Sequence, residues 1–138
     1  MSSGPAKPSH RWPQPQTALA VIGAGLVLQG LMFFAFAEPL TRQIFPGAGD
    51  EALHVGMVMR RSLAALSFLA GLVVFLVRRE SDRVAKRVLF GCGIGFSAMA
   101  AWMGKLMMDK AAVIPVPGMI IYMIAGVSAL YLAFRRAG

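Results

Sequence analysis

Charged side chains near one end of several apolar runs are the first candidates for chemistry in this sequence. Arg60, Arg61 and Lys105 lie within or beside such runs, and Asp109 follows Lys105 at i, i+4 spacing. Ionisable groups at membrane depth are by default candidates for function. We expect them to snorkel to the lipid headgroups and to form one or two structural ion pairs. The alternative is a polar mouth, including Gln29, that binds an anionic headgroup or substrate. Gln29 is the only strongly polar side chain of the first run and is expected to point into the bundle.

Methionines gather toward the same end of the apolar runs. Met103 and Met107 form one i, i+4 pair, and Met119 and Met123 form another, so each pair shares a helix face. Thioethers are soft ligands that suit Cu(I), and His54 could add an imidazole. We expect these methionines to serve in packing, because methionine fills irregular gaps. The alternative is a Cu(I) site, which requires that the two faces look at each other.

Other cofactor and enzyme chemistry has little support in the sequence. The two histidines, His10 and His54, fall at opposite ends of the predicted bundle, which argues against a bis-histidine haem in one copy. Quinone binding needs little sequence signature and stays open. No Ser-His-Asp set, paired carboxylates, zinc spacing or phosphate loop occurs, and Gly91-x-Gly93-x-Gly95 lies inside an apolar helix. The sequence favours a protein without enzymatic activity and with no assigned cofactor.

Four apolar runs must position these side chains. Of the 138 residues, 57% are hydrophobic and 14% are charged, and the mean hydropathy of +0.66 is typical of a membrane protein. Each run is long enough to cross a hydrocarbon core of about 30 Å as a helix. We predict an all-α, four-helix transmembrane bundle over residues 17–136, after a disordered tail at 1–16. Its spans are predicted at about 17–37, 58–77, 88–108 and 116–134.

Lysine and arginine predict the orientation of the bundle. The two tails and the 78–87 connection hold nine of them, and the other two connections hold only Arg42 and Lys110. The positive-inside rule then places both termini in the cytoplasm, in a bacterial cytoplasmic (inner) membrane. In this setting the net charge of +8 indicates contact with anionic lipids at the cytoplasmic face rather than with nucleic acid.

The first run also has features of a cleaved signal peptide. Lys7 and Arg11 precede it, and Ala35-Phe36-Ala37 resembles a signal-peptidase site. The apolar run is longer than the usual stretch of about 7 to 15 residues in signal peptides. We therefore expect the first span to be retained, and cleavage between Ala37 and Glu38 stays the alternative.

Small residues predict which helix faces pack together. Segment 88–108 carries small residues on two faces and is the predicted central helix of the bundle. One of its stripes contains Gly91, Gly95 and Ala98, and the preceding span offers a stripe of Arg60, Ala64, Ser67 and Gly71. We expect these stripes to pack antiparallel, which would bring Arg60 near Asp109. A Gly95→Leu substitution should then disrupt the bundle.

The architecture resembles that of the small bacterial membrane proteins known as DoxX-like. The resemblance rests on four spans, a proline-bearing outer loop and a basic connection at 78–87, and it assigns no functional residue. Our leading hypothesis is an accessory or interaction subunit that contacts a membrane-protein partner or a second copy. The alternatives are a transporter or binder of a small solute, such as Cu(I) or an amphiphile, and a quinone-contacting subunit of a redox complex.

Overall fold

Five helices make up the computed structural model, which describes residues 14–135 and has no strand in that range. Four of the helices are long and apolar enough to cross a membrane, which confirms the predicted all-α, four-span fold. The short fifth helix, α2, follows the first span. The helices are α1 (Pro15–Ala35), α2 (Ala37–Ile44), α3 (Asp50–Val77), α4 (Asp82–Met108) and α5 (Val116–Phe134).

The helix boundaries differ from the predicted spans mainly in the polar segments. Helix α1 already contains Pro15 and Gln16, because proline is well suited to the first helical position. Residues 1–13 of the predicted tail lie outside the described residues. Helix α4 begins at Asp82, inside the basic connection, where Lys86 forms an ion pair of 3.1 Å with Asp82. Helix α5 has the bounds predicted for the fourth span.

A sharp elbow at Phe36 separates α1 from α2. Pro39 explains it, because a continuous helix would need the missing Pro39 N–H to bond the Ala35 carbonyl. Helix α2 itself is 8 residues long. Its Thr41 is buried, and the Thr41 hydroxyl donates to the Ala37 carbonyl at 2.7 Å.

Helices α1 and α3 form a hairpin in which their backbones nearly touch at three glycines. A Cβ on Gly23 or on Gly30 would lie 2.7 Å from a backbone atom of α3, and one on Gly71 would lie 2.6 Å from the Val27 nitrogen. Only glycine allows such an approach. The Ser67 hydroxyl adds a hydrogen bond of 3.0 Å to the Leu26 carbonyl.

Helices α4 and α5 form a second hairpin of the same kind. A Cβ on Gly93 would lie 2.6 Å from Cγ of Leu130, and one on Gly126 would lie 2.9 Å from Oγ of Ser97. The Phe90 and Phe134 rings meet edge to face at 5.5 Å where this hairpin ends.

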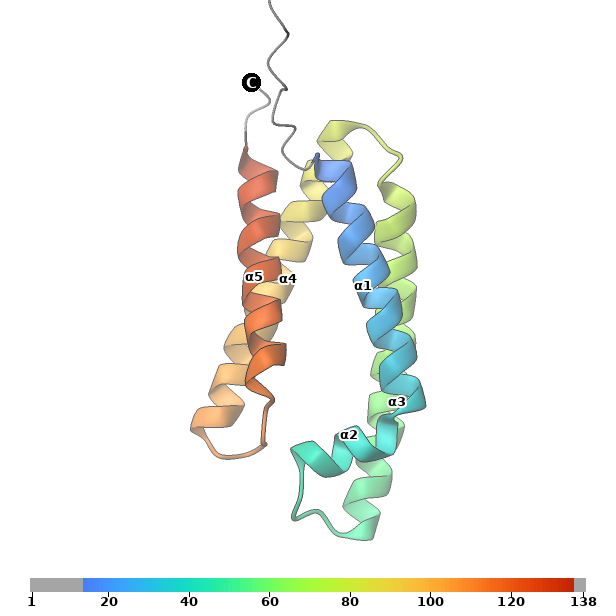
Figure 1. The fold of residues 1–138 in the computed structure, drawn as a ribbon, viewed down its shortest axis with the longest axis vertical. Coiled ribbons are helices and arrows are strands. Elements are labelled where there is room, and N and C mark those ends of the chain that lie inside the picture. Colours follow the sequence, from blue (N-terminus) through green and yellow to red (C-terminus); the bar gives the residue numbers. More distant parts are fainter. Residues whose placement is uncertain (1–13, 136–138) are drawn as a thin grey trace, which may run out of the picture.

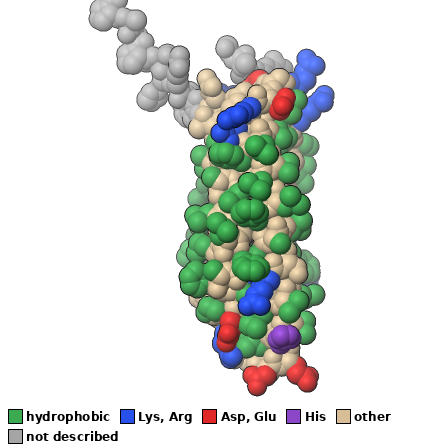
Figure 2. Space-filling view, turned by 90° about the vertical axis from the view of Figure 1, so that its right-hand side faces the viewer, with side chains coloured by type: hydrophobic (Ala, Val, Ile, Leu, Met, Phe, Trp, Pro, Cys, Tyr) green, Lys and Arg blue, Asp and Glu red, His purple; other side chains and the backbone are tan. Residues whose placement is uncertain are grey.

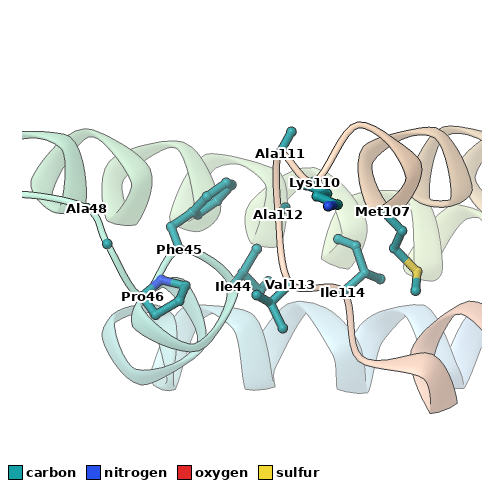
Figure 3. A pocket seen from close by; sticks show the side chains of 11 residues that line it. Ile44, Phe45, Pro46, Ala48, Met107, Lys110, Ala111, Ala112, Val113 and Ile114 are labelled. Carbon is teal, nitrogen blue, oxygen red and sulfur yellow. The ribbon is translucent and has the colours of Figure 1, made fainter.

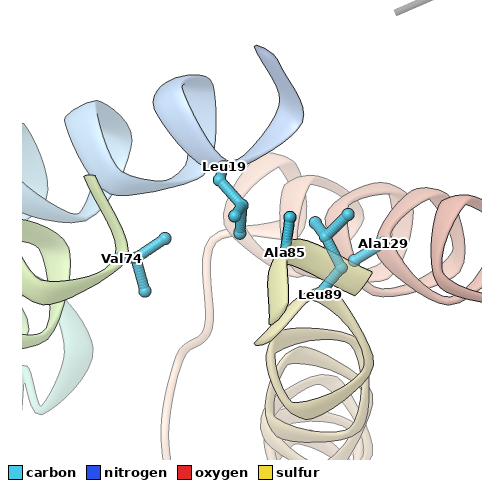
Figure 4. Close-up of a cluster of buried hydrophobic side chains, with 5 residues drawn as sticks. All are labelled: Leu19, Val74, Ala85, Leu89 and Ala129. Atoms are coloured by element: carbon cyan, nitrogen blue, oxygen red, sulfur yellow. The ribbon is translucent and has the colours of Figure 1, made fainter. Parts of the chain in front are cut away.

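The two hairpins converge at the end where residues 14 and 135 lie, and they diverge toward the opposite end (Figure 1). At the converging end, all four long helices contribute to a buried cluster, shown in Figure 4, of Leu19, Val74, Ala85, Leu89 and Ala129. Helix α1 contacts each of the other four helices. Helix α4, which contains the predicted central segment 88–108, contacts the other three long helices but not α2.

The outward surface of the bundle is apolar along its length. Leu28, Leu63 and Ile121 lie within the spans and are each at least 59% exposed. Figure 2 shows apolar side chains covering one face, with charged side chains gathered toward its two ends. This pattern suits a chain whose solvent is lipid along the middle and water at the ends.

Candidate functional site

The small-residue stripe of α3 does not meet the stripe of α4. Gly71 and Ser67 pack against α1 instead, and α3 contacts α4 only slightly. Apart from the chain neighbours and the nearby backbone of α4, no heavy atom of the described chain lies within 4 Å of a Cβ built on Gly91 or Gly95. The predicted pairing was therefore wrong. The reason is that α4 carries small residues on two faces, and the face with Gly93 and Ser97 is the one that α5 occupies.

The two arginines of α3 lie beside the elbow between α1 and α2. The Arg60 Nε donates to the Thr41 hydroxyl at 3.0 Å, and the Arg60 guanidinium lies 5.3 Å from the centre of the Phe33 ring. Arg61 lies 6.0 Å from the Phe34 ring. Arg60 therefore holds α2 against α3, and it does not approach Asp109 as predicted.

The Asp109 carboxylate pairs instead with Lys105 of its own helix, at 2.6 Å. Both side chains are more than half exposed, so this pair contributes only about 0–1 kcal/mol to stability. All ion pairs found within residues 14–135 are of this i, i+4 kind. The predicted polar mouth is thus divided between the elbow and the end of α4.

Gln29 does point into the bundle, as predicted. Its side-chain amide donates to the Tyr122 hydroxyl at 2.5 Å, and the Tyr122 ring lies 5.9 Å from that of Phe96. This hydrogen bond joins α1 to α5 and therefore links the two hairpins. A hydrogen bond between two helices in an apolar surrounding is typical of a structural contact.

The methionine pairs lie on the hairpin formed by α4 and α5. Gly126 faces Ser97, and this antiparallel register puts Met119 level with Gly104. The side chains of Met103, Met107 and Met119 are half-buried, whereas Met123 is 51% exposed and His54 is exposed. Copper ligation by these residues stays a prediction.

A pocket of about 580 Å³ lies between the two loops at the diverging end (Figure 3). We call it the outer pocket, and its walls are residues 44–48, Met107 and residues 110–114. The Val113 N–H donates to the Ile44 carbonyl at 2.9 Å and ties the loops together. Lys110 is the only charged residue in the lining.

Lys110 occupies a position that normally favours glycine. It follows the end of α4 with a φ of 53°, and two backbone hydrogen bonds close the helix around it, from Lys110 to Met107 and from Ala111 to Leu106. This is a Schellman ending, in which the left-handed residue is usually glycine. Sequence reasoning counted Lys110 only as a loop charge, because the pocket arises from loops far apart in the chain.

A smaller pocket of about 300 Å³ lies at the converging end, between the start of α4 and the end of α5. We call it the inner notch. Arg83, Lys86 and Arg87 line it together with Phe90, Ala133 and Phe134. Sequence reasoning assigned these cations to topology and to general contact with anionic lipids, not to a pocket. Their spacing at positions 83, 86, 87 and 90 was a signal for one shared helix face.

The third feature is the open face of α4, formed by Gly91, Gly95, Ala98 and Trp102. All four residues are exposed, and Trp102 is 56% exposed. The bulky Ile94 and Met99 flank the small residues and are also exposed.

Comparison with protein-family models, with curated proteins and with solved structures found no match for this chain.

Proposed function

We propose that this protein is a non-enzymatic membrane subunit that works by association, and that its first partner is a second copy of itself on the open face of α4. The observation that carries this proposal is the contrast between two glycine-bearing faces of one helix. The Leu130 side chain occupies the space beside Gly93, whereas Gly91 and Gly95 have no neighbour from another helix within 4 Å in the described chain. A helix surface made of glycines lets the backbone of another helix come close, and the resulting van der Waals packing favours helix association in a membrane.

A second copy suits this face because the face is self-complementary. Gly91 and Gly95 form a small-xxx-small pair, which brings two parallel helices into close contact. In a two-fold dimer, the same residues of each copy meet, so Ile94 of one helix would pack beside the glycines of the other. No charged residue interrupts α4 from 88 to 104, so the contact would bury no unpaired charge.

Energy transfer between labelled copies in proteoliposomes tests this proposal. Donor- and acceptor-labelled wild-type protein should show transfer that falls when unlabelled protein is added. Gly95→Leu should abolish the transfer and leave the helical content unchanged, because its Cβ meets no atom of its own chain. Gly25→Leu is the matched control, since Gly25 also has nothing within 4 Å among the described residues. Equal transfer for Gly95→Leu and wild type would overturn the proposal, as would a monomeric wild type that co-purifies with another membrane protein.

The outer pocket supports a second candidate function, the binding of a small amphiphile. Its volume lies within the range of ligand sites, and its apolar lining lies beside the exposed Lys110, which has no ion-pair partner among residues 14–135. A fluorescent fatty acid would place its carboxylate at Lys110. Lys110→Gln should weaken its binding, while Lys105→Gln, outside the lining, should not. Equal affinities of these two variants would dismiss this function.

We also propose that both termini face the cytoplasm of a bacterium and that the first span is retained. The nine-to-two distribution of basic residues supports the orientation. Retention is supported by the place of α1 in the fold. Cleavage after Ala37 would remove the helix that contacts all the others, together with the buried Leu19.

A further inference from the structure

We propose that the inner notch binds the phosphate of an anionic phospholipid, with one acyl chain of that lipid lying along Phe90 and Phe134. The notch combines three cations with an apolar floor in about 300 Å³. This combination matches a molecule that is anionic at one end and apolar at the other. A basic pocket between transmembrane helices is a known form of lipid headgroup site.

The cations of the notch converge because of their positions on one helix. Arg83, Lys86 and Arg87 occupy the first two turns of α4 and share the face that also carries Phe90. Phe90 lies about 10 Å further along the helix axis than Arg83, which is the direction into the membrane. A phosphate among the cations would therefore leave its acyl chain beside the Phe90 ring.

Two of these cations have no anionic partner in the described chain. Lys86 is paired with Asp82 at 3.1 Å, whereas Arg83 and Arg87 form no ion pair within residues 14–135. Each guanidinium group can donate two parallel N–H hydrogen bonds to a phosphate. These two arginines could therefore hold one phosphate between them.

The helix dipole adds a second electrostatic reason. The first turn of a helix carries partial positive charge and disfavours cations. The sequence nevertheless places Arg83 there, beside Asp82 as the only acidic residue of that turn, and Lys86 and Arg87 in the next turn. An anion bound in the notch would interact favourably with both the arginines and the dipole. Topology alone needs basic residues in this connection but does not require them to line a notch with two aromatic rings.

Native mass spectrometry of the purified full-length protein tests the proposal, with phosphatidylglycerol as the anionic probe and phosphatidylethanolamine as the zwitterionic one. Wild type should retain phosphatidylglycerol preferentially. Arg87→Gln should weaken its binding roughly fivefold, and Arg83→Gln/Arg87→Gln roughly 30-fold. Arg79→Gln is the matched control, because it removes the same charge from the same connection outside the notch. Its binding should stay within about twofold of wild type.

Three results would overturn the site. Equal weakening by Arg79→Gln and Arg87→Gln would mean diffuse attraction to the whole basic surface. Equal retention of the two lipids by wild type would exclude headgroup recognition, and this measurement decides the matter even if the double variant fails to insert. Displacement of the lipid by inorganic phosphate would show that the acyl chain contributes nothing.

Discussion

The closest approach between α1 and α3 predicts whether a glycine-to-alanine substitution there lowers or raises the stability of the protein. In Gly71→Ala, the new Cβ would lie 2.6 Å from the Val27 nitrogen, 2.7 Å from the Gly23 oxygen and 2.9 Å from the Leu26 Cβ. The first two are backbone atoms, which cannot move aside alone. Helix α1 would have to shift as a body, and the contacts at Gly23 would loosen with it.

The expected magnitude follows from two opposing terms. Overpacking costs about 1–3 kcal/mol, and backbone contacts this short place Gly71→Ala in the upper part of that range. Replacing a helical glycine by alanine returns about 1 kcal/mol of helix propensity. We therefore expect a net loss of about 1–2 kcal/mol. Gly25→Ala makes the same chemical change where no described atom lies within 4 Å, so it should gain up to about 1 kcal/mol.

Unfolding by sodium dodecyl sulfate in mixed micelles, followed by far-ultraviolet circular dichroism, measures both variants. Gly93→Ala gives an intermediate case, because its nearest atoms at 2.6 and 2.8 Å belong to the flexible Leu130 side chain. The expected order of stability is Gly25→Ala, wild type, Gly93→Ala, Gly71→Ala. If Gly71→Ala proved as stable as Gly25→Ala, the close pairing of α1 with α3 would be refuted.

Three further predictions concern single features. A double-mutant cycle of Gln29→Leu and Tyr122→Phe should give a coupling of about 0.6 kcal/mol in the same unfolding assay, and additive effects would mean that the bond between the hairpins contributes nothing. Lys110→Gly should raise stability by about 1 kcal/mol, because it relieves the left-handed conformation of a residue with a Cβ; no gain would contradict the Schellman ending. Reporter fusions after Gly138 should be cytoplasmic and those near Gly47 periplasmic, and the reverse result would overturn the orientation.

Hydropathy was sufficient to predict the long helices but not their partners. An apolar run of spanning length has few alternatives in a membrane, which is why the fourth span was predicted with the bounds of α5. Gln29 was also placed correctly, because one amide in an apolar helix must face the protein. The pockets could not be predicted in the same way. The outer pocket depends on two loops joined by one hydrogen bond, between residues 44 and 113, that no local pattern encodes.

The pairing of α1 with α3 did leave a signal in the sequence, which appears only when the spacings of small residues in the two helices are compared. Gly23 and Gly30 are seven residues apart in α1, and Ala64 and Gly71 are seven apart in α3. In an antiparallel pair, a seven-residue spacing on both helices lets Gly23 meet Gly71 while Gly30 meets Ala64, as the close contacts confirm. The stripe of α4 also has small residues seven apart, at Gly91 and Ala98, but only in α1 are both of these positions glycine. Two glycines allow the closest backbone approach, which is why α3 packs against α1.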